Sequence, residues 1–124
     1  MVRIICILTA ILVIPFGIAA VLAPAMVFGQ FGMTIDVVGA VVARGYGATA
    51  LGYGIVFLML RNAVERGVVL ALLVGALVFN GLEVLVQVPF AFAGLANAMI
   101  WVTICGHALV GGLAAVALVR GEGR

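Results

Sequence analysis

The sequence predicts an all-α membrane protein, folded as one antiparallel bundle of four transmembrane helices. The chain has 124 residues, of which 68% are hydrophobic and only 8% are charged, whereas a soluble domain has about 25% charged residues. The apolar residues form four long runs, and short polar segments separate them. A chain of this length cannot bury so much apolar surface, so the lipid bilayer must solvate it.

The four spans are expected to begin and end where the polar segments interrupt the apolar runs. Each is longer than the roughly 20 residues that a helix needs to cross the hydrocarbon core. The first run ends in "VLAPA" and could be mistaken for a signal peptide. It is longer than the apolar core of a signal peptide, and Pro24 stands where a cleavage site would lie, so we interpret it as a retained helix. The predicted spans, within a single transmembrane domain, are residues 4–28, 37–60, 67–88 and 96–119.

The arginines predict the direction of the helices. Short connections make neighbouring spans antiparallel, so the odd and even connections lie on opposite sides of the membrane. Arg44 is then the only arginine on its side of the membrane, and the other five lie on the opposite side. By the positive-inside rule, the side with five arginines is cytoplasmic, and both termini lie there. The arginines of the cytoplasmic side are Arg3, Arg61, Arg66, Arg120 and Arg124.

Several function classes lack support in the residues. A net charge of +2 without a basic run gives no reason to expect nucleic acid as a partner. Cys6 and Cys105 lie inside apolar runs, and no CxxC or Cys/His spacing suggests a metal site or a dithiol, so we expect no metal and no cofactor. No nucleophile–base pair or phosphate loop is present, so we do not expect an enzyme.

Small residues recur at helical spacing in two of the spans. Small side chains let helix backbones approach closely, and van der Waals contact then joins helices in lipid. We interpret both stripes as helix–helix seams, although glycine is also simply common in membrane helices. The stripes are Ala40, Ala43, Gly47, Ala50 and Gly54 in the second span, and Cys105, Ala108, Gly112 and Ala115 in the fourth.

Polar residues inside the spans gather in the outer half of the predicted bundle. An ionisable residue costs about 2.5–3.5 kcal/mol at the centre of a membrane helix. By helical rise, Arg44 and Glu83 lie at matching depth, and His107 lies near mid-membrane at the depth of Asn80. Helical spacing places Asn80, Glu83 and Gln87 on one face of the third span. It places Thr103 and His107 on one face of the fourth span.

We hypothesise an ion pair between Arg44 and Glu83, with Asn80 and His107 beneath it. Other interpretations stay open. Arg44 could snorkel to the outer interface, and His107 could be a packing residue with a satisfied ring. Glu83 could serve a proton or ligand site, or it could be a protonated, hydrogen-bonded carboxyl.

Two segments carry a resemblance to a known family. An exit from the first span, "LAPAMVFGQFG", is followed by "RGYGATALGYGIVFLMLRN", with an arginine at each end and small residues along one side. This pattern resembles the DoxX-like group of small four-helix bacterial membrane proteins, which implies a multi-pass protein of the bacterial inner membrane. Some DoxX relatives are subunits of oxidoreductase complexes that act on thiosulfate and quinone. No residue here matches a catalytic position of such an enzyme.

Two kinds of function are compatible with the sequence. The first is a structural or accessory protein that contacts membrane lipids and packs into a homo-oligomer or a larger membrane complex. The second is a small transporter, or a bundle that binds a lipid, quinone or anion in an outer-leaflet pocket. A cavity between the second, third and fourth spans would favour the second kind, and a dry, closed ion pair would favour the first. The pocket residues would be Arg44, Glu83, Asn80, His107, Gln87 and Thr103.

Overall fold

The structure, a computed structural model, describes residues 1–123, and these residues form five α-helices and no strand. Four of the helices are long and apolar enough to cross a membrane, which confirms the all-α class and the prediction of four candidate spans. Arg124, which was counted among the cytoplasmic arginines, lies outside the described residues. The helices are α1 (Val2–Leu22), α2 (Pro24–Gln30), α3 (Val37–Leu60), α4 (Arg66–Phe92) and α5 (Ile100–Val119).

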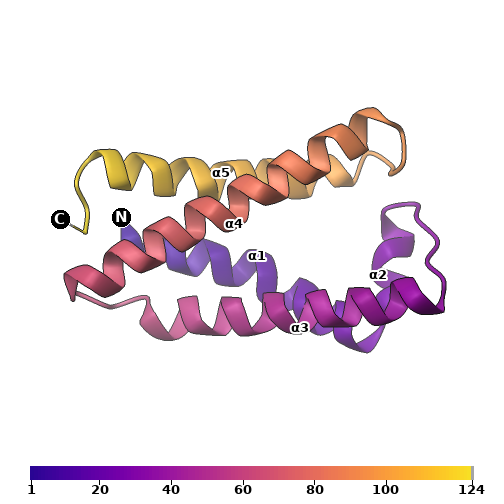
Figure 1. Ribbon diagram of the computed structural model, residues 1–124, viewed down its shortest axis with the longest axis horizontal. Coiled ribbons are helices and arrows are strands. Elements are labelled where there is room, and N and C mark those ends of the chain that lie inside the picture. The colour runs from indigo at the N-terminus through magenta and orange to yellow at the C-terminus, as the bar shows by residue number, and fades with distance from the viewer. Residues whose placement is uncertain (124) are drawn as a thin grey trace.

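The first predicted span is shorter than expected. Its helix, α1, ends at Leu22, and Ala23 leaves the helical conformation with φ −140° and ψ 62°. Pro24 explains the break, because it has no N–H and disfavours the helical conformation in the residue before it. The same residue is well suited to the first turn of the next helix, and the short helix α2 starts there. Residues 24–28 therefore belong to a separate helix at the end of the bundle (Figure 1).

The other helix ends show where proline and polar caps act. Helix α3 has the predicted bounds, and the Asp36 carboxylate caps it by accepting a hydrogen bond of 2.7 Å from the Gly39 N–H. Helix α4 continues through Pro89 to Phe92, since a proline in the last turn removes only one backbone hydrogen bond. Helix α5 begins later than predicted because residues 93–99 form a turn, in which Gly94 has φ +70°.

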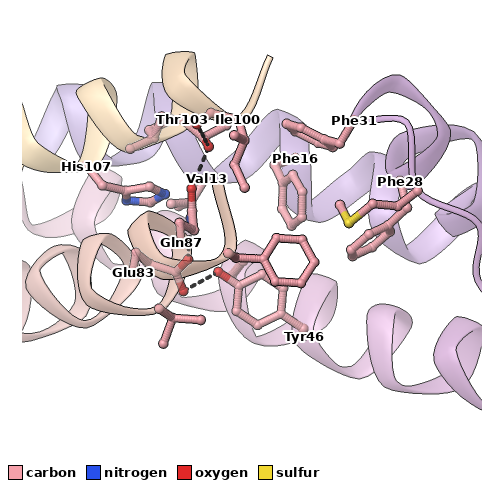
Figure 2. A pocket seen from close by; sticks show the side chains of 15 residues that line it. Val13, Phe16, Phe28, Phe31, Tyr46, Glu83, Gln87, Ile100, Thr103 and His107 are labelled. Atoms are coloured by element: carbon pink, nitrogen blue, oxygen red, sulfur yellow. Dashed lines mark hydrogen bonds between the residues drawn. The ribbon is translucent and has the colours of Figure 1, made fainter. Parts of the chain in front are cut away.

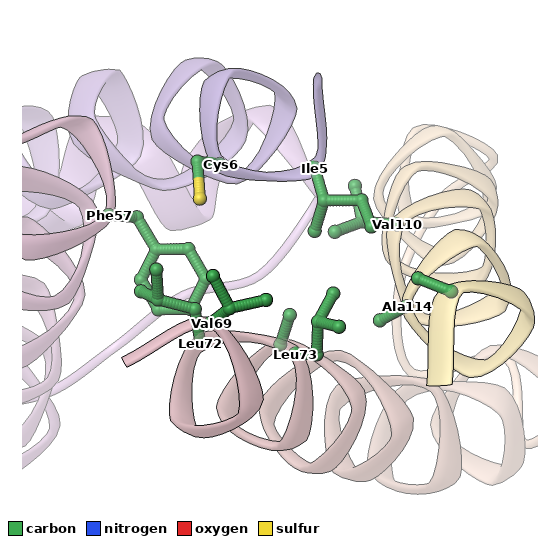
Figure 3. Packing of buried hydrophobic residues seen from close by; sticks show 10 residues of the cluster. Ile5, Cys6, Phe57, Val69, Leu72, Leu73, Val110 and Ala114 are labelled. Carbon is green, nitrogen blue, oxygen red and sulfur yellow. The ribbon is translucent and has the colours of Figure 1, made fainter. Parts of the chain in front are cut away.

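The four long helices are arranged as two closely packed pairs. Helix α1 lies along α3, and α4 lies along α5, whereas the contacts between the pairs are sparse (Figure 1). Both chain ends and the α3–α4 connection lie at one end of the bundle, and α2 lies at the other. At the end with the termini, an apolar cluster joins α1, α3, α4 and α5 (Figure 3). Its most buried members include Ile5, Cys6, Phe57, Leu73 and Ala114.

The stripe of small residues in α3 lies on the contact with α1. A Cβ atom on Gly47 would come within 2.8 Å of the Ala20 Cβ, and one on Gly17 would come within 2.7 Å of the Gly47 carbonyl oxygen. The two backbones therefore touch, as expected for a seam of small residues. The predicted stripe is half-buried at Ala40 and buried at Ala43, Gly47, Ala50 and Gly54.

The predicted stripe in α5 does not lie on a contact within the bundle. Cys105, Ala108 and Gly112 are exposed, and Ala115 is half-buried. A Cβ atom on Gly112 would have no neighbour within 4 Å. Both sides of this helix are apolar, so hydropathy does not distinguish the buried side from the exposed one. The side that is buried includes His107, Val110, Gly111 and Ala114.

Candidate functional site

A cavity of about 300 Å³ lies between the two helix pairs, in the half of the bundle next to α2 (Figure 2). Its volume is at the lower end of the range for small-molecule sites. Most of the lining is apolar, and helices α1 to α5 all contribute to it. The aromatic members are Phe16, Phe28, Phe31, Tyr46 and Phe90, and the other polar or ionisable members are Glu83, Gln87, Thr103 and His107.

Glu83 is held by two neutral donors. The Tyr46 hydroxyl donates a hydrogen bond of 2.6 Å to Oε1 of Glu83, and the Gln87 amide donates one of 2.8 Å to Oε2 (Figure 2). Tyr46 reaches across from α3, whereas Gln87 lies one turn further along α4, at the spacing that brings helical side chains together. Both oxygens of Glu83 thus act as acceptors.

The hydrogen-bonded chain continues from Gln87 to α5. Oγ1 of Thr103 lies 2.6 Å from Oε1 of Gln87 and 2.8 Å from the carbonyl oxygen of Ile100. Both of these oxygens are acceptors, and the Thr103 hydroxyl has one proton, so it can donate to only one of them at a time. The polar chain therefore connects α3, α4 and α5 along one wall of the cavity.

Asn80 and His107 form a second polar pair, deeper in the bundle. Asn80 is fully buried, and its amide donates a 2.8 Å hydrogen bond to the Ala76 carbonyl oxygen. The Asn80 Oδ1 lies 2.8 Å from Nδ1 of His107, so Nδ1 carries the proton that completes this bond. Nε2 of His107 has no hydrogen-bond partner among residues 1–123. The Phe79 ring packs edge-on against the imidazole at a centroid distance of 5.9 Å.

The hypothesised ion pair between Arg44 and Glu83 is not formed. Arg44 is exposed, and its Nε donates a 3.2 Å hydrogen bond to the Val21 carbonyl oxygen. That carbonyl belongs to the last turn of α1, where the break at Ala23 leaves backbone oxygens without a helical donor. A positive charge is also favourable at the C-terminal end of a helix. Arg44 therefore caps α1, and the carboxylate of Glu83 is left without a cationic side chain beside it.

The predicted polar residues thus divide into three groups. Glu83, Gln87, Thr103 and His107 line one cavity, Asn80 supports His107 from behind, and Arg44 lies outside the cavity lining. Sequence reasoning missed Tyr46 as the partner of Glu83, although its depth would have allowed the contact. It also missed the aromatic residues that close the end of the cavity, because they follow the unexpected break at Pro24. They are Phe28 and Phe31.

Neither metal ligands nor known relatives identify the role of the site. Among residues 1–123, no group of three or more His, Cys, Asp or Glu side chains is placed to hold a metal ion. No protein-family model, curated protein or solved structure matches the chain. The function is therefore inferred from the cavity and from the groups that line it.

Proposed function

We propose that the protein is a membrane-embedded binding bundle, in which the cavity beside Glu83 receives a small and largely apolar molecule. The observation that carries this proposal is a cavity of about 300 Å³ that contains a hydrogen-bonding carboxylate and no Arg or Lys in its lining. The aromatic and aliphatic lining would hold an apolar body, and the polar wall would orient its head. This arrangement is typical of small-molecule sites.

Energetics favour binding over a purely structural role for the polar groups. Apolar walls that face unfilled space lose packing contacts, and this loss destabilises a protein. A buried polar network likewise costs stability unless all its members are paired. A molecule that fills the space and contacts Glu83 would offset the first cost. A dry ion pair, which would have supported the structural role, is absent from the wall formed by Tyr46, Glu83, Gln87 and Thr103.

We further propose the finer topology that the sequence indicates. The helices would form an antiparallel bundle with both termini in the cytoplasm, so that the cavity opens in the outer half of the membrane. The location would be the bacterial inner membrane, and the group would be the DoxX-like proteins. The excess of arginine at the end with the termini supports this orientation. No catalytic role is proposed.

A second candidate is an accessory role in an oligomer or larger membrane complex. The observation in its favour is the stripe of small residues on α5, three members of which are exposed. In lipid, such a face allows another helix to approach closely. The two roles are compatible, since the stripe and the cavity lie on different faces of α5. The exposed members of the stripe are Cys105, Ala108 and Gly112.

Native mass spectrometry after purification in mild detergent tests both candidates. We expect a bound small molecule on the wild-type protein and its loss in Leu12→Trp, which fills the cavity from α1. The matched control is Ile11→Trp, because Ile11 is the neighbouring residue and is 65% exposed. Circular dichroism would check that both variants fold. Equal retention of the molecule in the two variants, or a wild-type protein without any adduct, would contradict the proposal, and the spectra would also give the oligomeric state.

A further inference from the structure

We infer that the cavity selects a lipophilic cation, of the organic ammonium class, and that this cation binds in exchange for a proton on Glu83. The inference rests on the proposed function, because it names the class of molecule that the cavity receives. Three features of the site carry it: the charges around Glu83, the aromatic walls, and a hydrogen-bonded chain that can accommodate two proton states.

The charges around Glu83 favour a cation. An anionic molecule would face the carboxylate across a largely apolar space, and only a cation can compensate the charge of Glu83 when it is ionised. A buried charge is costly unless it is paired, and Arg44 is engaged with the Val21 carbonyl. Neither Arg nor Lys lines the cavity from any helix. The residues that face Glu83 across the cavity are apolar or uncharged, apart from His107. They include Leu12, Val13 and Phe16 from α1, Tyr46 from α3, Gln87 from α4, and Thr103 and His107 from α5.

The aromatic walls favour an organic cation over a metal ion. Five aromatic side chains line the cavity, and Figure 2 shows Phe16, Phe28, Phe31 and Tyr46 around the same space. Phe16 and Tyr46 pack edge to face at a centroid distance of 5.7 Å. Aromatic rings attract cations, and the attraction strengthens where water is excluded. An ammonium group with apolar substituents would therefore satisfy both the carboxylate and the rings.

The polar chain can accommodate Glu83 with or without a proton. In the ionised state the Gln87 amide donates to Glu83, and Thr103 donates to Gln87 Oε1, over the distances given above. In the protonated state a half-turn of the Gln87 amide would let Glu83 donate to Oε1. The amide N–H would then donate to Thr103, whose hydroxyl donates to the Ile100 carbonyl oxygen at 2.8 Å. Tyr46 donates to Glu83 in both states, so every polar group in the chain keeps a partner.

This arrangement makes the exchange electrically balanced. In the proposed exchange, Glu83 would carry the proton before the cation enters, with the Gln87 amide turned as described above. When the cation enters, the O–H bond of Glu83 breaks, the proton leaves to water, and the carboxylate pairs with the cation. The net charge of the site is the same before and after, so the apolar surroundings never hold an isolated charge. The other titratable groups that face this region are Tyr46 and His107, and Nδ1 of His107 is already committed to Asn80.

Isothermal titration calorimetry on the purified full chain tests the inference with a matched pair of probes. Benzyltrimethylammonium is the cation, and neopentylbenzene has the same shape without the charge. Titrations in two buffers of different ionisation enthalpy give the number of protons released on binding. We expect the cation to bind at least about tenfold more tightly than the neutral probe. We also expect proton release that approaches one per cation at low pH and falls to zero as the pH rises.

Three variants assign the effect to Glu83. In Glu83→Gln, affinity for the cation should fall at least about tenfold and proton release should vanish, while the neutral probe still binds, which shows that the variant is folded. Glu65→Gln, in the exposed α3–α4 connection, should behave like the wild type. His107→Gln should retain proton release, because the proton belongs to Glu83.

The outcomes separate this inference from the proposed function. If both probes bind the wild type with equal affinity, or if Glu83→Gln retains the cation affinity, the cation class is wrong while the binding cavity stands. Binding of the cation without proton release at any pH would overturn the exchange. If neither probe binds and the native protein carries no adduct, the binding function itself is wrong.

Discussion

The contact between α1 and α3 predicts a large difference between two chemically identical substitutions. Gly47→Ala adds a methyl group that would lie 2.8 Å from the Ala20 Cβ, 2.9 Å from the Gly17 carbonyl oxygen and 3.1 Å from the Val21 nitrogen. Gly52→Ala adds the same group to the same helix, at a position with no neighbour within 4 Å. The first substitution should push the helices apart, and the second should not.

The magnitude follows from the geometry of the contact. Ordinary van der Waals contact begins at 3.4 Å, so the new methyl on Gly47 falls 0.6 Å short of it at Ala20. Two of the three opposing atoms belong to the α1 backbone and cannot turn away. Overpacking of this kind costs about 1–3 kcal/mol, whereas alanine gains about 1 kcal/mol over glycine in a helix. Gly52→Ala receives only the gain, so the two variants should differ in unfolding free energy by about 1–3 kcal/mol.

Unfolding by SDS in mixed micelles measures this difference. Trp101 is the single tryptophan of the chain, and its ring packs edge-on against Phe92 at a centroid distance of 5.4 Å, so its fluorescence reports on the α4–α5 end. Circular dichroism reports on all the helices and should give the same transition. If Gly47→Ala and Gly52→Ala unfold at the same SDS fraction, the backbones of α1 and α3 do not touch as described.

Two further predictions concern the helix caps. Arg44→Gln should lower the unfolding free energy by about 1–2 kcal/mol, because the hydrogen bond to the Val21 carbonyl is lost. In a double-mutant cycle, the coupling energy between Arg44→Gln and Glu83→Gln should be within about 0.5 kcal/mol of zero. A clearly larger coupling energy would show that the two side chains form an ion pair after all. Asp36→Ala should lower the unfolding free energy by about 1 kcal/mol, because it removes the cap of α3. Asp36→Asn should retain most of this stability, since asparagine also caps helices. An unchanged SDS midpoint for Asp36→Ala would refute the cap.

The sequence predicted the parts of the fold that depend on hydropathy. Long apolar runs and short polar connections were enough to place four candidate spans, and α3 has the predicted bounds. The break at Ala23 was missed because Pro24 lies within a continuous apolar run, where hydropathy does not change. The outward position of Gly112 was missed because the fourth span is apolar on all sides, so periodicity does not identify its buried face. Orientation in the membrane stays a prediction.

Sequence reasoning was less complete for the site. Depth and helical spacing correctly grouped Glu83 with Gln87, because both depend only on the helix repeat. The partner of Arg44 could not be found in the same way, since it is a backbone carbonyl that becomes free only where α1 breaks. The partner of Glu83 was not found either, because the bond from the Tyr46 hydroxyl depends on how α3 and α4 are placed in three dimensions.

An experimental structure of the protein, purified with native lipids, would test the central claim most directly. The claim is that the space beside Glu83 is a binding cavity. We predict defined density for a small molecule among the aromatic side chains, with a polar atom within hydrogen-bonding distance of the Glu83 carboxylate. A dry and collapsed space, with Arg44 turned inward to pair with Glu83, would contradict the claim.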